Sequence, residues 1–388
     1  MGTSTLSFEF ATAARILFGE GRVREAGTIA AELGVHALLV ESGSGRAAPL
    51  VALLHEHGVA TTSLHVTGEP TTTLVEQGVE RARHAECDLV IAFGGGSVID
   101  AGKAVAALIT NREPLIEYLE VVGRGRPLTE RSVPMIAIPT TAGTGAEVTR
   151  NAVLMVEESR VKVSLRSPFM LPAVALVDPE LTYSLPPDVT ASTGLDALTQ
   201  CLEPFVSPFA TPLTDAVARE GMRRASGALH RAVRHGDNMD ARTDMSIASL
   251  CGGLALANAK LGAVHGFAAP LGGMFPIPHG ETCARLLAPV VEVNVRALRA
   301  RAAGSPALAR YDEAARILTG SPTARAEDAV AWLRELVDEL HVPRLGAYGV
   351  REVDVARVVE PARRASSMQG NPIPLTDDEL SEILRAAL

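Results

Sequence analysis

Short apolar runs that alternate with helix-like stretches constrain the fold of the first half of the chain more than any other feature. Three such runs, each followed by Gly, Ser or Thr, are HALLVES from His36, CDLVIAFGGGS from Cys87 and VPMIAIPTTAGTG from Val133. The stretches at 48–58 and 72–85 have apolar residues at three- and four-residue spacing, which is typical of amphipathic helices. Continuous buried strands alternating with helices predict a parallel sheet that is covered on both faces.

The second half of the chain has a different pattern, because strand-like runs disappear after SLPPDVTAS. Helical periodicity follows in successive segments up to the C-terminus, where Thr376 and Glu379 are spaced as a capping box. The chain of 388 residues is too long for one ordinary core, and the pair Pro186–Pro187 stops local structure. We therefore predict an α/β domain over 1–185 and an all-helical domain over 186–388, with a ligand cleft between them.

One glycine-rich loop follows the predicted strand that begins at Cys87. In FGGGSVIDAGKA, the glycines let the backbone approach a ligand, Ser97 is placed to cap the next helix, and Asp100 lies three residues on. The free N–H groups at that helix start suit a pyrophosphate. The loop is neither GxGxxG nor a Walker loop, so the pattern alone also fits a tight turn with a good cap.

A second loop of this kind, PTTAGTGAEVT, follows the predicted strand from Val133. Thr140, Thr141 and Thr144 supply hydroxyls, and Gly143 and Gly145 supply backbone freedom. Two glycine-rich loops at the ends of parallel strands mark the crevice where such sheets bind nucleotides. The alternative is that both loops are only turns.

Four polar side chains in the second half are spaced as a metal site. In GLDALTQCLEPF, Asp196 and Gln200 share one helix face, and His265 and His279 each precede a Gly in an apolar segment. A carboxylate with two imidazoles suits Fe²⁺ or Zn²⁺. Gln200 would add a neutral amide oxygen, a poorer donor than imidazole, so we expect a less tightly held metal.

Charge and composition narrow the class of partner. The formal charge is −9, and the stretches RGRPLTERS and RALRARAAG are short and mixed, so the chain lacks the basic patch of a nucleic-acid binder. The N-terminus lacks the pattern of a signal peptide, and no apolar run reaches membrane-spanning length. Four cysteines without a CxxC pair fit reduced thiols, so we expect a cytoplasmic protein.

The motifs together resemble those of the iron-containing (group III) alcohol dehydrogenases, which include lactaldehyde and maleylacetate reductases. GGGSVIDAGK, IPTTAGTGAEVT, STGLDALT, VHG and PHG occur in the family's order, and the match covers nearly the whole chain. The resemblance implies a Rossmann-like domain that binds NAD(H) or NADP(H), a helical metal-binding domain, the architecture of dehydroquinate synthase, and at least a homodimer.

Carried over motif by motif, the resemblance implies the following residues. The cofactor would be bound by Gly94, Gly95, Gly96, Ser97, Asp100, Thr140, Thr141, Thr144 and Lys162. The metal ligands would be Asp196, Gln200, His265 and His279. Asp196 and the two histidines would thereby also serve the reaction.

The chain departs from the family's pattern at two of these places. Gln200 stands where the family usually has His, so the metal is expected to be weak, different in identity, or absent as in maleylacetate reductases. Ala269 stands where a further His commonly relays protons. Lys260 is then a candidate for a catalytic role in proton transfer, with a surface lysine as the other interpretation.

Glu41 and Ser42, which follow the strand HALLV, influence whether NAD or NADP is bound. An acidic residue there accepts the ribose hydroxyls of NAD and repels the 2′-phosphate of NADP. Glu41 offers such a carboxylate, whereas Ser42 is closer to the family's discriminating Asp by motif spacing. The pattern favours NAD only slightly.

The predicted activity is reversible hydride transfer between a small-molecule alcohol and a nicotinamide cofactor, assisted by a metal. Three alternatives remain: a metal-free reductase of an unsaturated keto acid, resembling maleylacetate reductase; a lyase or cyclase of the dehydroquinate synthase type; and a binding protein that has lost its chemistry.

Overall fold

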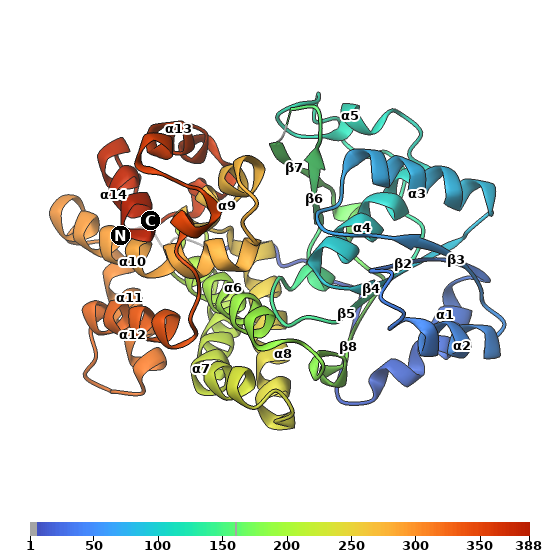
Figure 1. Ribbon diagram of the computed structural model, residues 1–388, viewed down its shortest axis with the longest axis horizontal. Coiled ribbons are helices and arrows are strands. Elements are labelled where there is room, and N and C mark those ends of the chain that lie inside the picture. The colour runs from blue at the N-terminus through green and yellow to red at the C-terminus, as the bar shows by residue number, and fades with distance from the viewer. Residues whose placement is uncertain (1–5, 160) are drawn as a thin grey trace.

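The computed structural model describes residues 6–159 and 161–388, which form two lobes (Figure 1). Residues 1–5, part of the stretch considered above as a signal peptide, lie outside the described residues. The described strands all belong to the first lobe: β1 (Arg15–Phe18), β2 (His36–Glu41), β3 (Ala60–His65), β4 (Leu89–Gly94), β5 (Met135–Pro139), β6 (Asn151–Val156), β7 (Val161–Arg166) and β8 (Val174–Val177). The second lobe is helical, which confirms the predicted fold class.

The main sheet has the order β1-β8-β5-β4-β2-β3, and all its strand pairs are parallel. The three apolar runs identified in the sequence are the neighbouring strands β2, β4 and β5. In the register, Glu41 lies beside Phe93, and Gly94 lies beside Pro139. The segments that follow these strands therefore begin side by side at one edge of the sheet.

Helices cover both faces of this sheet (Figure 1). Successive residues of β2 pack on opposite sides: Leu38 joins the apolar cluster under α3 (Thr72–His84) and α4 (Gly96–Thr110). Leu39 joins the cluster under α1 (Ala26–Leu33) and α2 (Ala48–Glu56). Burial on both faces explains why these strands are continuous apolar runs. A short helix, α5 (Leu115–Tyr118), completes the lobe.

An antiparallel hairpin of β6 and β7 stands apart from the main sheet. Alternate residues of β6 are buried, the pattern of a strand with one covered face. The hairpin packs on α4 through β6 and on α9 (Ala263–Met274) through β7. It therefore connects the sheet lobe to the helical lobe.

The helical lobe is arranged around α6 (Pro187–Val206), which is buried along nearly its whole length. It packs against α7 (Pro212–Arg234), α8 (Met239–Ala259) and α10 (His279–Arg301). The predicted capping box is confirmed, since Thr376 Oγ1 accepts from the Glu379 N–H and Glu379 accepts from the Thr376 N–H. The remaining helices are α11 (Pro306–Thr319), α12 (Ala326–Glu339), α13 (Val355–Arg364) and α14 (Asp377–Ala387).

Among the described helices, no single one is long and apolar enough to cross a membrane. The pair α8 and α9 meets that test only jointly, and the two helices join at an angle of 99°. Both contribute buried residues to the core of the helical lobe.

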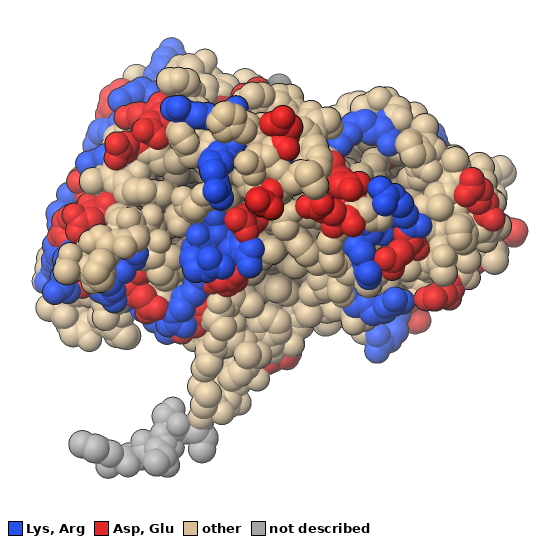
Figure 2. All heavy atoms as spheres, turned by 90° about the horizontal axis from the view of Figure 1, so that it is seen from below, with Lys and Arg blue, Asp and Glu red and all other residues tan. Residues whose placement is uncertain are grey.

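The arginines of the RALRARAAG stretch lie on α10 and are paired with carboxylates. Arg296 and Arg301 bind Glu382 and Glu379 of α14, each at 2.5 Å, and Arg299 binds Glu327 of α12. Figure 2 shows basic and acidic residues interspersed over one face of the molecule. The mixed, solvated surface predicted for this stretch is the one observed.

Candidate metal and cofactor site

The two glycine-rich loops contact each other at the edge of the sheet. A Cβ atom on Gly96 would lie 2.8 Å from Thr144 Oγ1, and one on Gly95 would lie 3.4 Å from Thr141 Oγ1. Glycine is therefore required at position 96 for the loops to approach this closely. Thr141 and Thr144 are partly exposed, whereas Thr140 is buried. The two loops thus lie against each other at one edge of the sheet, where we predict the cofactor to bind.

The start of α4 differs from the prediction in one respect. Gly95 occupies the N-cap position in an extended conformation without a side-chain cap, and Gly96 is the first helical residue. Ser97 therefore lies inside the first turn, and its prediction as the cap is wrong. The helix begins earlier because glycines let the backbone enter it without a capping side chain, which leaves the first N–H groups available to an anion.

Asp100 and Lys103 connect α4 to the segment after the second loop. Asp100 accepts from the Val153 N–H at 2.9 Å and pairs with Lys103 at 2.8 Å. The fully buried Lys103 ammonium also donates to Thr149 Oγ1 at 2.9 Å and to the Ala146 carbonyl at 3.1 Å. Asp100 thus holds β6 against α4, and its contact with a cofactor stays a prediction.

At the end of β2, the Glu41 carboxylate is already bound within the protein. It accepts from the Gly43 N–H at 2.7 Å and pairs with His65 at 2.9 Å, and it is buried. Ser42 is exposed, and its hydroxyl donates to Ser44 at 3.0 Å. The side chain most open to a bound ribose at this strand end is therefore Ser42.

The second loop also lies against the helical lobe. A Cβ atom on Gly143 would approach Thr193 of α6 to 2.8 Å, and one on Gly145 would approach the Gly253 backbone of α8 to 2.5 Å. Thr193 precedes Asp196 by about one helical turn. The second loop, predicted to bind the cofactor, and the predicted metal helix are consequently in direct contact.

The structure brings Asp196, His265 and His279 together from three helices, α6, α9 and α10. Asp196 Oδ1 lies 3.3 Å from His265 Nε2 and 3.6 Å from His279 Nε2. Asp196 and His265 are buried, while the side chain of His279 is 36% exposed. The predicted carboxylate and imidazoles therefore converge on one point with one open side.

Gln200 lies one turn after Asp196 on the same face of α6, and its Nε2 donates to Asp196 Oδ2 at 2.8 Å. Asp196 Oδ1 and Gln200 Oε1 are buried and lack a hydrogen-bond partner within the described ranges. Such buried oxygens beside imidazole nitrogens need a cation or a donor to offset their desolvation. This set of donor atoms therefore fits a divalent metal. Asp196, His265 and His279 would be its ligands, and Gln200 Oε1 lies next to them.

Glu203, which the sequence analysis missed, continues the same face of α6. Its Oε2 binds His265 Nδ1 at 2.7 Å, and its Oε1 accepts from the Val264 N–H at 2.7 Å. This bond keeps the ring proton on Nδ1 and leaves Nε2 free as a ligand, as in carboxylate–histidine–metal arrangements. The signal in the sequence was the spacing of 196, 200 and 203 on one helix face.

Cys283 is the second neighbour that the sequence analysis missed. It lies four residues after His279 on α10, is buried, and places Sγ 3.7 Å from both His265 Nε2 and His279 Nε2. Its distance in sequence from Asp196 concealed this placement. A Cβ atom on Gly280 would lie 2.4 Å from the Ser192 carbonyl, so this glycine allows α10 to start against α6.

Neighbouring charges within the cluster shift the pKa of its carboxylate and of its imidazoles. Burial alone would raise the pKa of Asp196, but the charges of His279 and His265 lower it to about 2. Electrostatic interaction with Cys283 and with Asp196 raises the pKa of His279 to about 9, against the effect of burial. Burial opposes charging of His265 as well, yet Cys283 and the contacts with Asp196 and Glu203 raise its pKa above the usual range. The anionic groups thus favour positive charge at this point.

The two lysines proposed for the site are placed differently. Lys162 of β7 is nearly buried, pairs with Glu69 at 2.8 Å, and lies next to Gly272 of α9, so it borders the crevice between the lobes. Lys260 is exposed, donates to Gln369 at 2.8 Å and lies 4.2 Å from the Phe209 ring centre. These contacts hold Lys260 in the surface turn that ends α8, as in the interpretation of a surface lysine, and a role in proton transfer stays a prediction.

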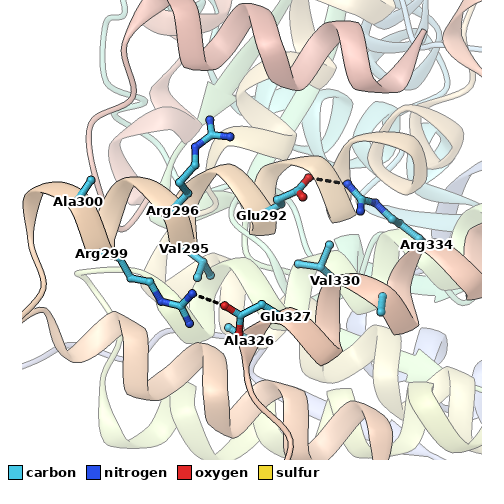
Figure 3. A pocket seen from close by; sticks show the side chains of 10 residues that line it. Glu292, Val295, Arg296, Arg299, Ala300, Ala326, Glu327, Val330 and Arg334 are labelled. Carbon is cyan, nitrogen blue, oxygen red and sulfur yellow. Dashed lines mark hydrogen bonds and ion pairs between the residues drawn. The ribbon is translucent and has the colours of Figure 1, made fainter.

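A separate groove lies between α10 and α12 (Figure 3). Arg334 and Glu292 are paired across it at 2.5 Å, and Arg299 also pairs with Glu327. Arg296, the third arginine of the lining, pairs with Glu382 of α14, and the other lining residues are Ala and Val. None of these residues belongs to the metal cluster. We therefore place the reaction site in the crevice instead.

Comparison with known proteins identifies the family of both lobes. Residues 13–179 match the model for iron-containing alcohol dehydrogenases, and residues 190–388 match the model for the C-terminal part of that family. A choline dehydrogenase of Bacillus subtilis (strain 168) is 35% identical over 379 residues, covering 96% of this chain and 92% of the relative.

Solved structures agree with this match. The crystal structure of a 1,3-propanediol oxidoreductase superimposes with a TM-score of 0.91 at 32% identity, covering 99% of this chain and 100% of the other. That of a sulfoacetaldehyde reductase from Bifidobacterium kashiwanohense, in complex with NAD⁺, has a TM-score of 0.86 at 30% identity, with 99% of each chain covered. The chain described here belongs to the iron-containing alcohol dehydrogenase family.

Proposed function

We propose that this protein interconverts a small alcohol and the corresponding aldehyde or ketone by hydride transfer with NAD(H) or NADP(H), assisted by a divalent metal. The observation that carries the proposal is the direct contact between the second glycine-rich loop and α6. Gly143 meets Thr193, about one turn before Asp196. A cofactor gripped by the loops would therefore have its reactive end beside the metal cluster.

In this proposal, residues on one side of the crevice would bind the cofactor and residues on the other side would bind the metal. The N–H groups at the start of α4, with the hydroxyls of Thr141 and Thr144, would bind the cofactor's diphosphate. Asp196, His265 and His279 would hold the metal, and Glu203 keeps the proton on His265 Nδ1. A metal bound there would polarise the substrate oxygen and stabilise negative charge that develops on it.

The substrate we propose is a small-molecule alcohol or carbonyl compound. The relatives named above are a choline dehydrogenase, a 1,3-propanediol oxidoreductase and a sulfoacetaldehyde reductase. The metal-free alternative is not favoured, because the relatives are dehydrogenases and the carboxylate–imidazole set is complete. Because the relatives are a dehydrogenase and an oxidoreductase, they also favour an oxidoreductase over a lyase or a binding protein without catalytic activity.

A direct assay tests the function. Purified protein loaded with Zn²⁺ or Fe²⁺ is offered short alcohols, diols and aldehydes, and NAD(P)H absorbance is followed. We expect turnover with at least one short alcohol or aldehyde that is lost after chelation and restored by metal. Full activity after exhaustive chelation would support the metal-free reductase, and cofactor binding without any turnover would support a binding protein.

The end of β2 leads us to infer that NADP(H) is accepted as well as NAD(H). Glu41 is engaged by Gly43 and His65, and the exposed Ser42 carries no charge that would repel a 2′-phosphate. We expect the two dissociation constants to lie within about tenfold of each other in equilibrium titrations. A preference for NAD(H) above about 100-fold would contradict this inference.

A homo-oligomer and a cytoplasmic location remain predictions from the sequence. Light scattering of the purified protein tests the first, and cell fractionation tests the second.

A further inference from the structure

We propose that Cys283 is a ligand of the metal, as a thiolate, and replaces the fourth ligand that Gln200 supplies poorly. This inference rests on the proposed function only in assuming that a metal binds at Asp196. It concerns which atoms of this chain hold that metal.

The distances between donor atoms support a four-ligand set. Around a tetrahedral ion with bonds of about 2.0 to 2.3 Å, neighbouring donors lie roughly 3.3 to 3.7 Å apart. Asp196 Oδ1 lies 3.3 and 3.6 Å from the two Nε2 atoms, and Cys283 Sγ lies 3.7 Å from each of them. The four donor atoms all lie within 4.8 Å of one another. Cys283 therefore already has the spacing of a ligand.

A buried oxygen without a hydrogen-bond partner independently indicates that this cluster suits a cation. Asp196 is 1% exposed, and its Oδ1, the atom nearest both imidazoles, lacks a hydrogen-bond partner among the residues described. His265 presents Nε2 to the same point, because its Nδ1 is bound to Glu203. The carboxylate, the two rings and the thiol thus face one centre.

The chemistry of the donor atom favours the thiolate over the amide. A deprotonated Cys283 offers an anionic ligand atom to a divalent cation, whereas the amide of Gln200 is neutral. Gln200 instead orients Asp196 through its Nε2 hydrogen bond.

The softness of sulfur gives this site a distinct metal preference. Thiolate ligands favour Zn²⁺, whereas hard cations prefer oxygen ligands. A substrate would reach this cluster from the side where the side chain of His279 is exposed. We therefore expect this family member to bind Zn²⁺ through Cys283.

Cobalt spectroscopy of the full-length protein tests the ligand set without relying on activity. The metal is removed by chelation, Co²⁺ is added, and the near-ultraviolet absorption is recorded. We expect one Co²⁺ per chain with a thiolate-to-cobalt charge-transfer band in the wild-type protein. Cys87, Cys201 and Cys251 lie outside the cluster, so the band identifies Cys283 even if its variant fails to fold.

Variants then test whether the charge-transfer band and the Zn²⁺ affinity depend on Cys283. Cys283→Ser is expected to lose the band and to bind Zn²⁺ more than about 100-fold more weakly, a larger loss than for Mn²⁺. Gln200→Ala and the matched control Cys251→Ser, at another buried thiol, should keep the band. Circular dichroism checks that each variant is folded.

Three results would overturn the proposal. The wild-type protein could bind Co²⁺ without a thiolate band, or it could bind no Co²⁺ at all. The third result is equal Zn²⁺ affinity in the wild-type protein and a folded Cys283→Ser variant. A thiolate band in a protein that oxidises no alcohol would instead uphold the ligand assignment and remove the proposed function.

Discussion

The two sides of the crevice are built in different ways. The side that is predicted to bind the cofactor, called here the cofactor wall, consists of loops 94–97 and 140–145 with the end of β2, and is mainly backbone that follows three neighbouring parallel strands. The side that is predicted to bind the metal, called here the metal wall, consists of side chains from three helices: Asp196, His265, His279, Glu203 and Cys283.

This difference determines which amino-acid substitutions each wall tolerates. A wall of backbone depends on the lack of side chains, since an added Cβ at position 96 collides with Thr144. A wall of side chains depends on the chemistry of each donor, while the helices that carry them stay the same. A ligand can therefore be exchanged for one on another helix, as we propose for Gln200 and Cys283. Each variant below is expected to damage one wall and spare the other.

Asp196→Asn should have the largest effect, because it removes the carboxylate that is predicted to hold the metal. We expect kcat/KM to fall by at least about 1000-fold, with metal content near zero, since a bound metal contributes several kcal/mol to the transition state. Cofactor affinity, measured by fluorescence titration, should be unchanged. Asp188→Asn, on the exposed start of α6, is the matched control. Retention of both metal and turnover would refute the assigned role of Asp196.

Glu147 should give the cofactor side of the molecule a pH-dependent stability. It lies directly after the second loop, and burial raises its pKa from 4.5 to about 7. Between these values the unfolded chain loses a proton that the folded chain keeps. The free energy of unfolding should therefore fall as pH rises through this window, by about 3 kcal/mol in total.

Denaturant titrations between pH 4.5 and pH 8 measure this effect, with Glu147→Gln as the comparison. The variant should lose this component of the pH dependence and keep its metal content. Identical pH profiles for variant and wild type would show that the Glu147 carboxyl is not the group responsible.

Glu203→Gln tests whether the metal wall depends on the partner of His265. We expect metal affinity to fall by roughly 10- to 100-fold, because the ring loses the anion that holds its proton on Nδ1. A competition titration with a chromophoric chelator measures this, and Glu335→Gln on the exposed side of α12 is the control. A change in thermal stability of the metal-free protein with unaltered metal affinity would indicate a structural role only.

Gly96→Ala should have the smallest effect and should be confined to the cofactor wall. The new Cβ would lie 2.8 Å from Thr144 Oγ1, so the loops must separate, and we expect about tenfold weaker binding of NAD(P)H. Gly227→Ala is the matched control, since a Cβ there meets nothing within 4 Å. If metal binding weakened as much as cofactor binding, the two walls would not be separable as described.

Local patterns were sufficient for much of the α/β lobe. The strands β2, β4 and β5, the loops after them and the Thr376 capping box follow from residues close together in sequence. Ser97 was assigned as a cap because serine usually has that role, whereas a helix entered through glycines begins without one. The hairpin of β6 and β7 was not predicted, although its residues alternate as a half-buried pair does.

The metal site was predicted only in part for a different reason. Asp196, His265 and His279 stood out because polar ligand types in apolar segments are unusual, and the family motif supported them. Glu203 and Cys283 did not, because a carboxylate and a lone cysteine are common in helices. Lys260 was proposed because it precedes His265 closely in sequence, yet the turn at the end of α8 leaves it at the surface.

The sequence by itself determined the layered α/β lobe, the helical lobe and the positions of the two loops, because periodicity and glycine placement act over a few neighbouring residues. Only the tertiary structure decided which side chains meet at the metal. Asp196, His265 and Cys283 lie on three different helices, and the packing of α10 against both α6 and α9 sets their distances. That packing depends on the shapes of many buried side chains at once, which no local pattern contains.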